Sequence, residues 1–407
     1  MSQSIVSQSI VSPSVVSPSV MPPSVMPRGL DAGRLAHLGA TVAADIAAGR
    51  YHGAGIIVAR DGKIGLEEAL GRVRSTSQSP VRKDSVFSLL SVTKAFTNVL
   101  VLRAIERGQL SLFTKVSSVI PEFSGLPRSE VTVEHLLTHK SGLPGVYTPR
   151  PGMYLDRLDE IIAAICSSLN CVDEPGTRVS YAPMAGQALL GELLRRTDPL
   201  KRSYRQIVTD DLFTPLGMSD SAIGVRADLK SRHIPPELPP HFPATHPGSS
   251  DLGTHGAFEE EQSEMPWVGG FATAGDLYRF AEMLRRGGAL DGQRILSPRM
   301  VDVATRNFTG DLPNLMFAAR GLTRGWKPSP AYLGLGFQLR GEAMSRHIFG
   351  TLTSPRTFGN QGAGSTLYWV DPDLGMTFVC LTVPVLDDGD NIERFQRLSD
   401  IAVAAAT

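Results

Sequence analysis

One stretch of the sequence organises the rest: Val86-Phe87-Ser88-Leu89-Leu90-Ser91-Val92-Thr93-Lys94-Ala95-Phe96-Thr97. Ser91 stands three residues before Lys94, and no other lysine of the chain has a serine at that spacing. Positions i and i+3 of a helix lie on one face, so the hydroxyl and the amine are within reach if a helix begins near Ser91. A lysine in the first turn opposes the helix dipole, and a residue placed against its local preference is expected at a functional site.

The pair predicts a nucleophile with its own base. A serine hydroxyl is a weak nucleophile until a neighbouring base takes its proton. A lysine can be that base only if its pKa falls from a reference value of about 10.4. Burial against Phe87, Phe96 and Leu100 is the kind of desolvation that lowers it. Ser-x-x-Lys also occurs by chance on solvated helices, so the prediction depends on the apolar residues around it.

Length and composition limit the classes of protein to which this chain can belong. The 407 residues can hold one large domain or two closely packed ones, and 42% hydrophobic with 20% charged residues is typical of a soluble globular chain. Forty basic and forty acidic residues balance, which argues against a nucleic-acid or membrane partner. No apolar run is long enough to span a bilayer. Three cysteines without metal-type spacing predict reduced thiols in a cytoplasmic protein, although two could pair.

Residues 1–27 differ from the rest of the chain. They repeat a five-residue unit that begins as Ser-Gln-Ser-Ile-Val and changes gradually to Pro-Pro-Ser-Val-Met. The segment has no basic start, continuous apolar core or small-residue cleavage site, so it does not qualify as a signal peptide. Serine and proline at this density predict a disordered tail. We therefore expect the catalytic domain to cover residues 28–407.

The spacing of apolar residues and the positions of turn residues predict where helices and strands lie. A hairpin is predicted at Asp61-Gly62, between strands 54–60 and 63–71, and a helix runs from Ser91 to about Arg107 with Gly108 after its end. Further helices are expected at 31–49, 154–169, 184–196, 204–212, 273–286, 298–307 and 391–405, and further strands at 365–370 and 376–383.

Strands at both chain ends with helices between them indicate an α/β (α+β) fold. We expect an antiparallel sheet built from both chain ends, flanked by helices, with an inserted and mostly helical domain. The sheet part should cover about residues 28–90 and 290–407, and the helical part about 91–289. Residues 226–266 are rich in proline, glycine and histidine and lack periodicity, which predicts a functional or disordered loop.

Over about residues 30–405 the sequence resembles the serine β-lactamase and penicillin-binding-protein superfamily, particularly its class C-like esterases and transesterases. The resemblance rests on four motifs in order: Ser91-Val92-Thr93-Lys94, Leu136-Leu137-Thr138-His139-Lys140-Ser141-Gly142-Leu143, Pro215-Leu216-Gly217-Met218 and Gly269-Gly270-Phe271-Ala272-Thr273-Ala274-Gly275-Asp276-Leu277. It implies a serine hydrolase that forms an acyl-enzyme on Ser91 without a cofactor.

Two further family motifs are altered. The resemblance implies that Tyr181 shuttles a proton, but Pro183 replaces the asparagine that holds a substrate amide. The third motif appears as Asn360-Gln361-Gly362, so Asn360 replaces the cation that grips a substrate carboxylate. By the same resemblance, the N–H groups of Ser91 and Ala363 form the oxyanion hole. These changes favour esters over β-lactams.

The resemblance also implies which other residues contact the substrate. Asn360, Gln361, Gly362 and Pro183 would line the site. The loop 226–266 would form part of its rim, where Phe258 and the adjacent Trp267 offer apolar contact. The acyl group would come from a small molecule or a short peptide.

Other functions stay open at this point. An α/β-hydrolase is unsupported, because Gly-x-Ser-x-Gly is absent. His233, His241, His246 and His255 could build a metal hydrolase but lack His-Glu-x-x-His spacing, and His135 and His139 lie four apart, although the resemblance makes them structural. We therefore expect no metal. The alternatives to an esterase or transesterase are a peptidase or amidase on small peptides, including D-amino-acid or linearised non-ribosomal ones, and an inactive scaffold protein.

Overall fold

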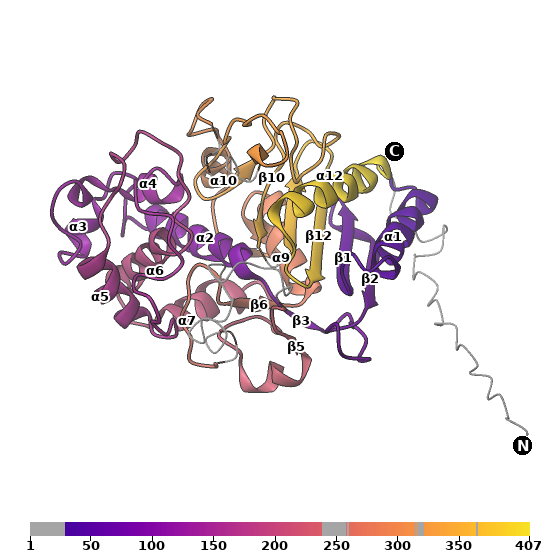
Figure 1. Cartoon of the computed structure of the whole chain (residues 1–407), viewed down its shortest axis with the longest axis horizontal. Coiled ribbons are helices and arrows are strands. Elements are labelled where there is room, and N and C mark those ends of the chain that lie inside the picture. Colours follow the sequence, from indigo (N-terminus) through magenta and orange to yellow (C-terminus); the bar gives the residue numbers. More distant parts are fainter. Residues whose placement is uncertain (1–28, 238–257, 259, 314, 316–320, 364) are drawn as a thin grey trace, which may run out of the picture.

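The structure, a computed structural model, describes residues 29–237, 258, 260–313, 315, 321–363 and 365–407. Its centre is a six-stranded antiparallel sheet in the order β2-β1-β12-β11-β10-β9 (Figure 1). The strands are β1 (Gly53–Arg60), β2 (Lys63–Gly71), β9 (Gln338–Leu339), β10 (Phe358–Gly362), β11 (Thr366–Asp371) and β12 (Met376–Val383). The predicted fold class is confirmed, because strands from the two chain ends pair at the centre, Gly53 opposite Val383.

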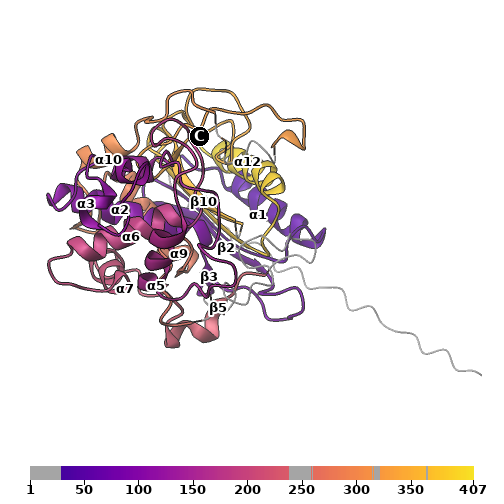
Figure 2. The same ribbon diagram turned by 60° about the vertical axis from the view of Figure 1, so that its left-hand side comes forward.

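Helices cover both faces of this sheet. α1 (Ala32–Ala47) and α12 (Asp388–Ala404) lie side by side on one face, and α9 (Ala274–Arg285) lies on the other (Figures 1 and 2). Hydrogen bonds tie each layer to the sheet: for example, Trp369 Nε1 donates to Ser399 Oγ of α12 at 3.0 Å, and Thr377 Oγ1 donates to Glu282 Oε2 of α9 at 3.0 Å. Strands covered on both faces are buried along their length, as β12 is.

The inserted part of the chain is mostly helical. It contains α2 (Thr93–Glu106), α3 (Val116–Val119), α4 (Val133–Leu137), α5 (Leu158–Ser168), α6 (Ala185–Thr197) and α7 (Tyr204–Val208). α2 is its central helix and is buried on nearly every side. Phe96 of α2 makes edge-on contacts with Phe213 at 5.2 Å and with Phe280 of α9 at 4.8 Å, so α2 joins the helical part to the sheet. α9, which the sequence division places with the helical part, packs on the sheet.

A second, four-stranded sheet lies beside α2. Its order is β4-β6-β3-β5, with bounds β3 (Val86–Ser88), β4 (Ala222–Ile223), β5 (His233–Ile234) and β6 (Gly270–Ala272). Further elements of the described residues include α10 (Pro298–Ala304) and the short hairpin of β7 (Ala289–Leu290) and β8 (Gln293–Arg294). β3 ends three residues before Ser91, so this sheet fixes the approach to α2.

Turn and cap residues explain the bounds of the first hairpin and of the last helix. Asp61 and Gly62 have φ of 51° and 78°, the left-handed values that a tight two-residue hairpin requires. The last helix begins three residues before its predicted start, because Asp387 accepts a hydrogen bond from Gly389 N and caps it. Among the described residues, no helix is both long and apolar enough to cross a membrane. The predicted tail, residues 1–27, lies outside the described residues.

Candidate active site

A strained turn presents Ser91. After β3 the chain enters a 3-10 turn, Leu90–Val92, and then α2. Leu90 has φ of 47°, a left-handed value that costs a non-glycine residue energy and that clusters at functional sites. Two hydrogen bonds fix the residue before the turn: Leu89 N donates to Gly270 O at 2.9 Å, and Thr366 Oγ1 donates to Leu89 O at 2.8 Å. Both sheets therefore hold the serine in place.

Three predicted residues meet at the Ser91 hydroxyl. Lys94 Nζ lies 2.9 Å from Ser91 Oγ, and Tyr181 Oη lies 3.1 Å from the same oxygen. The Lys94 side chain also passes over the Tyr181 ring, with Nζ 5.3 Å from the ring centroid. Hydroxyl, amine and phenol are thus all close enough to exchange protons.

Lys94 has the environment of a base. It is only 4% exposed, and burial holds its pKa well below the ordinary value of a lysine. Its second partner is the carbonyl oxygen of Trp267 at 3.0 Å, and no carboxylate of the described residues is ion-paired with it. A carbonyl accepts an N–H from either the neutral or the charged amine, whereas a carboxylate would favour the charged form. The site therefore favours the neutral, proton-accepting lysine.

The Trp267 carbonyl is held in place from α2. Thr97, one turn after Lys94, donates from Oγ1 to Pro266 O at 2.8 Å, and the Tyr204 hydroxyl lies 2.7 Å from the same Thr97 oxygen. The Pro266 ring also packs closely against Gly191 of α6, since a Cβ on Gly191 would lie 2.4 Å from that ring. These contacts fix the 266–267 backbone above Lys94. Sequence reasoning missed this role, because a backbone carbonyl carries no residue-specific signal.

Tyr181 is positioned by the segment around His139. The two rings meet edge to face with centroids 5.1 Å apart, and the His139 carbonyl accepts a hydrogen bond from Ser180 N at 2.9 Å. Gly142 turns the chain with φ of 71°, where a Cβ would lie 2.1 Å from Asp173 O. Burial and the nearby Lys94 lower the pKa of His139 to about 4, so its ring is neutral near pH 7. His139 is therefore a neutral support for Tyr181.

The end of β10 lies against the Ser91 backbone. A Cβ on Gly362 would stand 2.5 Å from Leu89 O and 3.1 Å from Ser91 N. Such a close approach is possible only for glycine. Ala363 follows in the turn to β11, so its N–H and that of Ser91 are the candidate oxyanion donors.

Asn360 is engaged inside the protein. Its Nδ2 donates to Gly336 O at 3.1 Å, and its Oδ1 accepts from the Tyr368 hydroxyl at 2.8 Å. The side chain is buried with both amide atoms bonded inside the protein, and its predicted contact with substrate stays a prediction. Gln361 is half-buried beside it, and Pro183 is buried two residues after Tyr181.

The predicted aromatic rim also differs from expectation. Trp267 is 4% exposed and Phe258 is 1% exposed, so both side chains belong to the core rather than to an open rim. Large aromatic side chains gain most by such burial, which the flanking polar loop sequence concealed. Residues 238–257 and 259 of that loop lie outside the described residues.

The histidines do not form a metal site in the described part of the chain. No group of three or more potential ligands comes together there. His135 Nδ1 accepts from Thr132 N at 3.3 Å as part of a helix cap, and His233 Nε2 lies 3.0 Å from Ser88 Oγ. His241, His246 and His255 lie outside the described residues.

Comparison with known proteins identifies the family of this chain. Residues 38–400 match the family described as Beta-lactamase. Penicillin-binding protein 4 of Amycolatopsis lactamdurans is 31% identical over 283 residues, which cover 67% of this chain and 70% of that protein. Esterase EstB of Burkholderia gladioli is 28% identical over 373 residues, covering 82% and 86%.

Among solved structures, EstCE1, described as a hydrolase with promiscuous acyltransferase activity, superimposes with a TM-score of 0.73 at 19% identity. The match covers 91% of this chain and 99% of that one. At this identity the likeness concerns the fold alone. The family match over residues 38–400, with the 31% identical penicillin-binding protein, establishes that this protein belongs to the beta-lactamase family of serine hydrolases, which includes penicillin-binding proteins and esterases.

Proposed function

We propose that this chain is an esterase or acyltransferase that carries an acyl group of a small molecule on Ser91. The observation that supports it best is the position of the Ser91 hydroxyl, 2.9 Å from a buried amine and 3.1 Å from a phenol. A scaffold protein without activity would have no need for all three groups. We therefore rank the inactive alternative below an enzyme.

Acylation would begin at Lys94. The lone pair of its neutral amine takes the Ser91 proton while an N–H stays bonded to Trp267 O. Ser91 Oγ then attacks the ester carbonyl carbon, and the N–H groups of Ser91 and Ala363 stabilise the oxyanion, an effect worth about 3–4 kcal/mol per donor in other enzymes. Tyr181 gives its proton to the departing alkoxide and recovers one from Lys94. The carbon–Oγ bond forms in the attack, and the carbon–oxygen bond to the leaving group breaks when the tetrahedral intermediate collapses to the acyl-enzyme.

Deacylation would run the same steps in reverse with a new nucleophile. Tyr181 and Lys94 remove a proton from the incoming hydroxyl, which attacks the acyl carbon and restores Ser91. Water as the nucleophile gives hydrolysis, and a second alcohol gives acyl transfer. Both reactions use one acyl-enzyme, so one site can support both.

The altered motifs favour a neutral ester as the substrate. Asn360 carries no charge and its amide is already bonded to Gly336 and Tyr368, while Pro183 offers no donor. A β-lactam would leave its carboxylate and amide without these partners, and each missing partner costs about 1–3 kcal/mol or more. The esterase relative supports the same assignment.

A peptidase or amidase is the second candidate. The 31% identity to a penicillin-binding protein favours it, because the same acyl-enzyme could form from a small peptide with an amine as leaving group. The proton from Tyr181 would then go to nitrogen.

A panel of three substrates separates the candidates. We propose to measure kcat/KM for p-nitrophenyl butyrate, D-alanyl p-nitroanilide and nitrocefin, with the wild type, Ser91→Ala and Ser88→Ala. Ser88 is a matched control. Like Ser91 it is a serine with a possible base beside it, the His233 ring, but its side chain is buried, at 7% exposure. We expect the ester to be the best substrate, Ser91→Ala to be inactive and Ser88→Ala to stay active. Preference for the anilide would favour the peptidase, preference for nitrocefin would refute the ester assignment, and inactivity on all three would favour a scaffold.

A further inference from the structure

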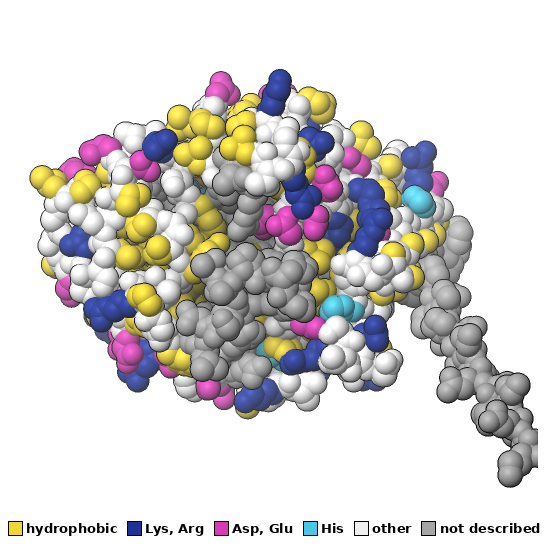
Figure 3. Space-filling view, viewed as in Figure 1, with side chains coloured by type: hydrophobic (Ala, Val, Ile, Leu, Met, Phe, Trp, Pro, Cys, Tyr) yellow, Lys and Arg dark blue, Asp and Glu magenta, His cyan; other side chains and the backbone are white. Residues whose placement is uncertain are grey.

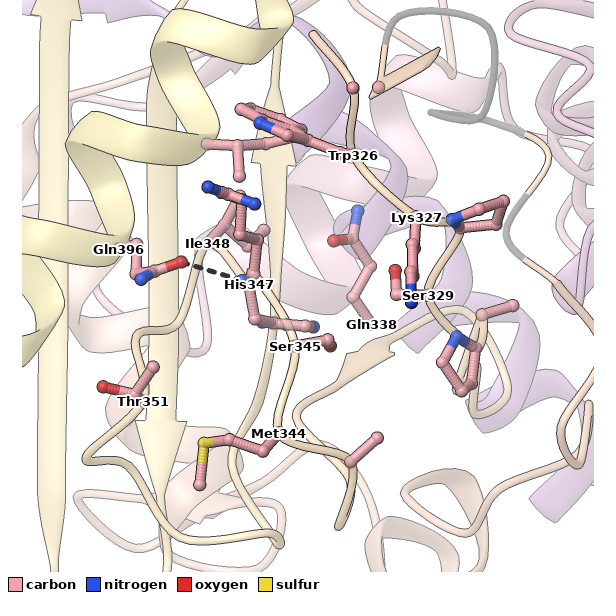
Figure 4. A pocket seen from close by; sticks show the side chains of 18 residues that line it. Trp326, Lys327, Ser329, Gln338, Met344, Ser345, His347, Ile348, Thr351 and Gln396 are labelled. Atoms are coloured by element: carbon pink, nitrogen blue, oxygen red, sulfur yellow. Dashed lines mark hydrogen bonds between the residues drawn. The ribbon is translucent and has the colours of Figure 1, made fainter.

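A cavity lies apart from the residues that surround Ser91. It has a volume of about 600 Å³ and opens between the segment 321–351 and α12 (Figure 4). Cavities of about 300–1,000 Å³ are the size that binds small organic molecules. None of its described lining residues is Ser91, Lys94, Tyr181 or a residue of 360–363. The cavity is therefore a separate site in the described part of the chain.

The charged side chains that line the described part of the cavity are all positive. Lys327 and Arg346 line it, and none of its described lining residues is Asp or Glu. Neither cation is ion-paired with a carboxylate of the described residues. The acidic residues at the start of α12 pair with another cation: Asp387 and Asp390 both accept hydrogen bonds from Arg324, at 2.9 and 2.8 Å. Two cations facing a cavity without a carboxylate would stabilise an anion there.

The rest of the lining is mixed apolar and hydrogen-bonding. The Trp326 ring stands at the cavity with the Arg346 guanidinium 4.8 Å from its centroid, and Ile348 and Ile392 add aliphatic surface. Ser329 and Gln338 offer hydroxyl and amide groups, and Figure 4 shows both on the side of the cavity away from α12. Hydrophobic side chains are exposed along the upper edge of the face shown in Figure 3. The lining residue Met344 is 79% exposed. An anion with an apolar body fits this lining better than a bare inorganic ion.

The cavity wall is fixed before any ligand arrives. The buried Arg340 donates to Gly350 O at 2.8 Å and to Ala343 O at 2.7 Å, which pins the loop between these residues. His347 N donates to Gln396 Oε1 of α12 at 3.2 Å, the bond drawn in Figure 4. Burial lowers the pKa of His347 to about 3, so its neutral ring adds no charge. A preformed wall reduces the ordering cost of binding.

We propose that this cavity binds a small organic carboxylate with an apolar body. Its carboxylate lies between Lys327 and Arg346, and its apolar part lies against Trp326, Ile348 and Ile392. Binding does not involve Ser91, so this proposal stands independently of the proposed function.

The test uses Trp326 as the reporter on the full-length protein. The chain has three tryptophans, and the other two, Trp267 and Trp369, are buried at 4% and 0% exposure. Hexanoate, its uncharged analogue hexanamide and inorganic phosphate are titrated at constant ionic strength while the fluorescence is recorded. We expect saturable quenching by hexanoate, with hexanamide and phosphate each weaker by about tenfold or more, the factor that one charge-assisted hydrogen bond supplies. Trp326→Phe should abolish the signal.

Variants locate the binding. Lys327→Gln with Arg346→Gln should weaken hexanoate about tenfold or more and leave ester turnover unchanged. The matched control, Lys63→Gln with Arg299→Gln, removes two exposed cations elsewhere, and Ser91→Ala should bind hexanoate normally. The proposal would be overturned if hexanoate caused no quenching, or if hexanamide or phosphate quenched as strongly as hexanoate. It would also be overturned if Lys327→Gln with Arg346→Gln bound hexanoate as tightly as the wild type, or if Ser91→Ala did not bind it.

Discussion

Gly362→Ala is the change that most directly probes how β10 meets the nucleophile. The added Cβ would stand 2.4 Å from Thr366 Oγ1, 2.5 Å from Leu89 O and 3.1 Å from Ser91 N. The position of the Cβ is set by the backbone of residue 362 and the Leu89 carbonyl is itself backbone, so this contact cannot be relieved by rotating a side chain. Either the end of β10 or the Leu89–Ser91 turn must move away.

The size of the effect follows from that displacement. An ordinary Cβ contact begins near 3.4 Å, so Leu89 O and the new methyl must separate by 0.9 Å from 2.5 Å. A misplacement of about 1 Å in a catalytic site can cost about 10²-fold, and loss of one oxyanion donor costs about 10²–10³-fold in kcat. Overpacking at the same point should lower the free energy of unfolding by about 1–3 kcal/mol. We expect a folded protein with activity reduced by about 10²-fold or more.

The assay is kcat/KM on p-nitrophenyl butyrate, measured with the thermal midpoint by circular dichroism. Gly275→Ala is the matched control: it lies in α9, has no positive φ and would contact only Thr273 Oγ1, at 3.8 Å. That variant should behave as the wild type. A Gly362→Ala protein with activity within about threefold of wild type, or about 0.65 kcal/mol, would refute the proposed role of the Ser91–β10 contact.

Three further predictions concern the proton-transfer groups. Lys94→Ala, Tyr181→Phe and the double variant should show strongly non-additive losses of turnover on one ester, because groups that act as a unit do so; additive losses in log rate would mean separate roles. The pH profile of kcat/KM should fall on the acid side as Lys94 becomes protonated, at a pH below the ordinary lysine range because burial lowers its pKa; Lys94→Arg, always charged, should be inactive throughout. His139→Phe should retain most turnover, since the ring that supports Tyr181 is neutral near pH 7, and a loss as large as that of His139→Ala would contradict a packing role.

The sequence was most informative where local signals are strong. The hairpin at Asp61-Gly62 and the strand 376–383 were predicted at or within one residue of their observed bounds, because turn residues and continuous apolar runs mark them. Ser91 and Lys94 are near in the chain, so their proximity follows from helix geometry alone. Tyr181 lies ninety positions from Ser91, and only the family resemblance brought it to the site.

Features that depend on long-range packing were not predictable. β10 reads Phe-Gly-Asn-Gln-Gly, which has neither alternation nor β-branched residues, and it forms because β9 and β11 pair with it. Asn360 was expected to face substrate, but its partners Gly336 and Tyr368 come from other segments. Trp267 contributes a carbonyl that no residue pattern encodes. The cytoplasmic location, the domain boundaries and the disordered tail stay predictions.

The most direct test of the central claim is the site of covalent capture. The full-length protein is treated with a fluorophosphonate and digested, and the modified peptide is identified by mass spectrometry, with Ser91→Ala and Ser88→Ala treated in parallel. We predict one adduct per chain, on Ser91, present in Ser88→Ala and absent from Ser91→Ala. An adduct on any other serine, with Ser91→Ala still able to turn over the ester, would contradict an acyl-enzyme on Ser91.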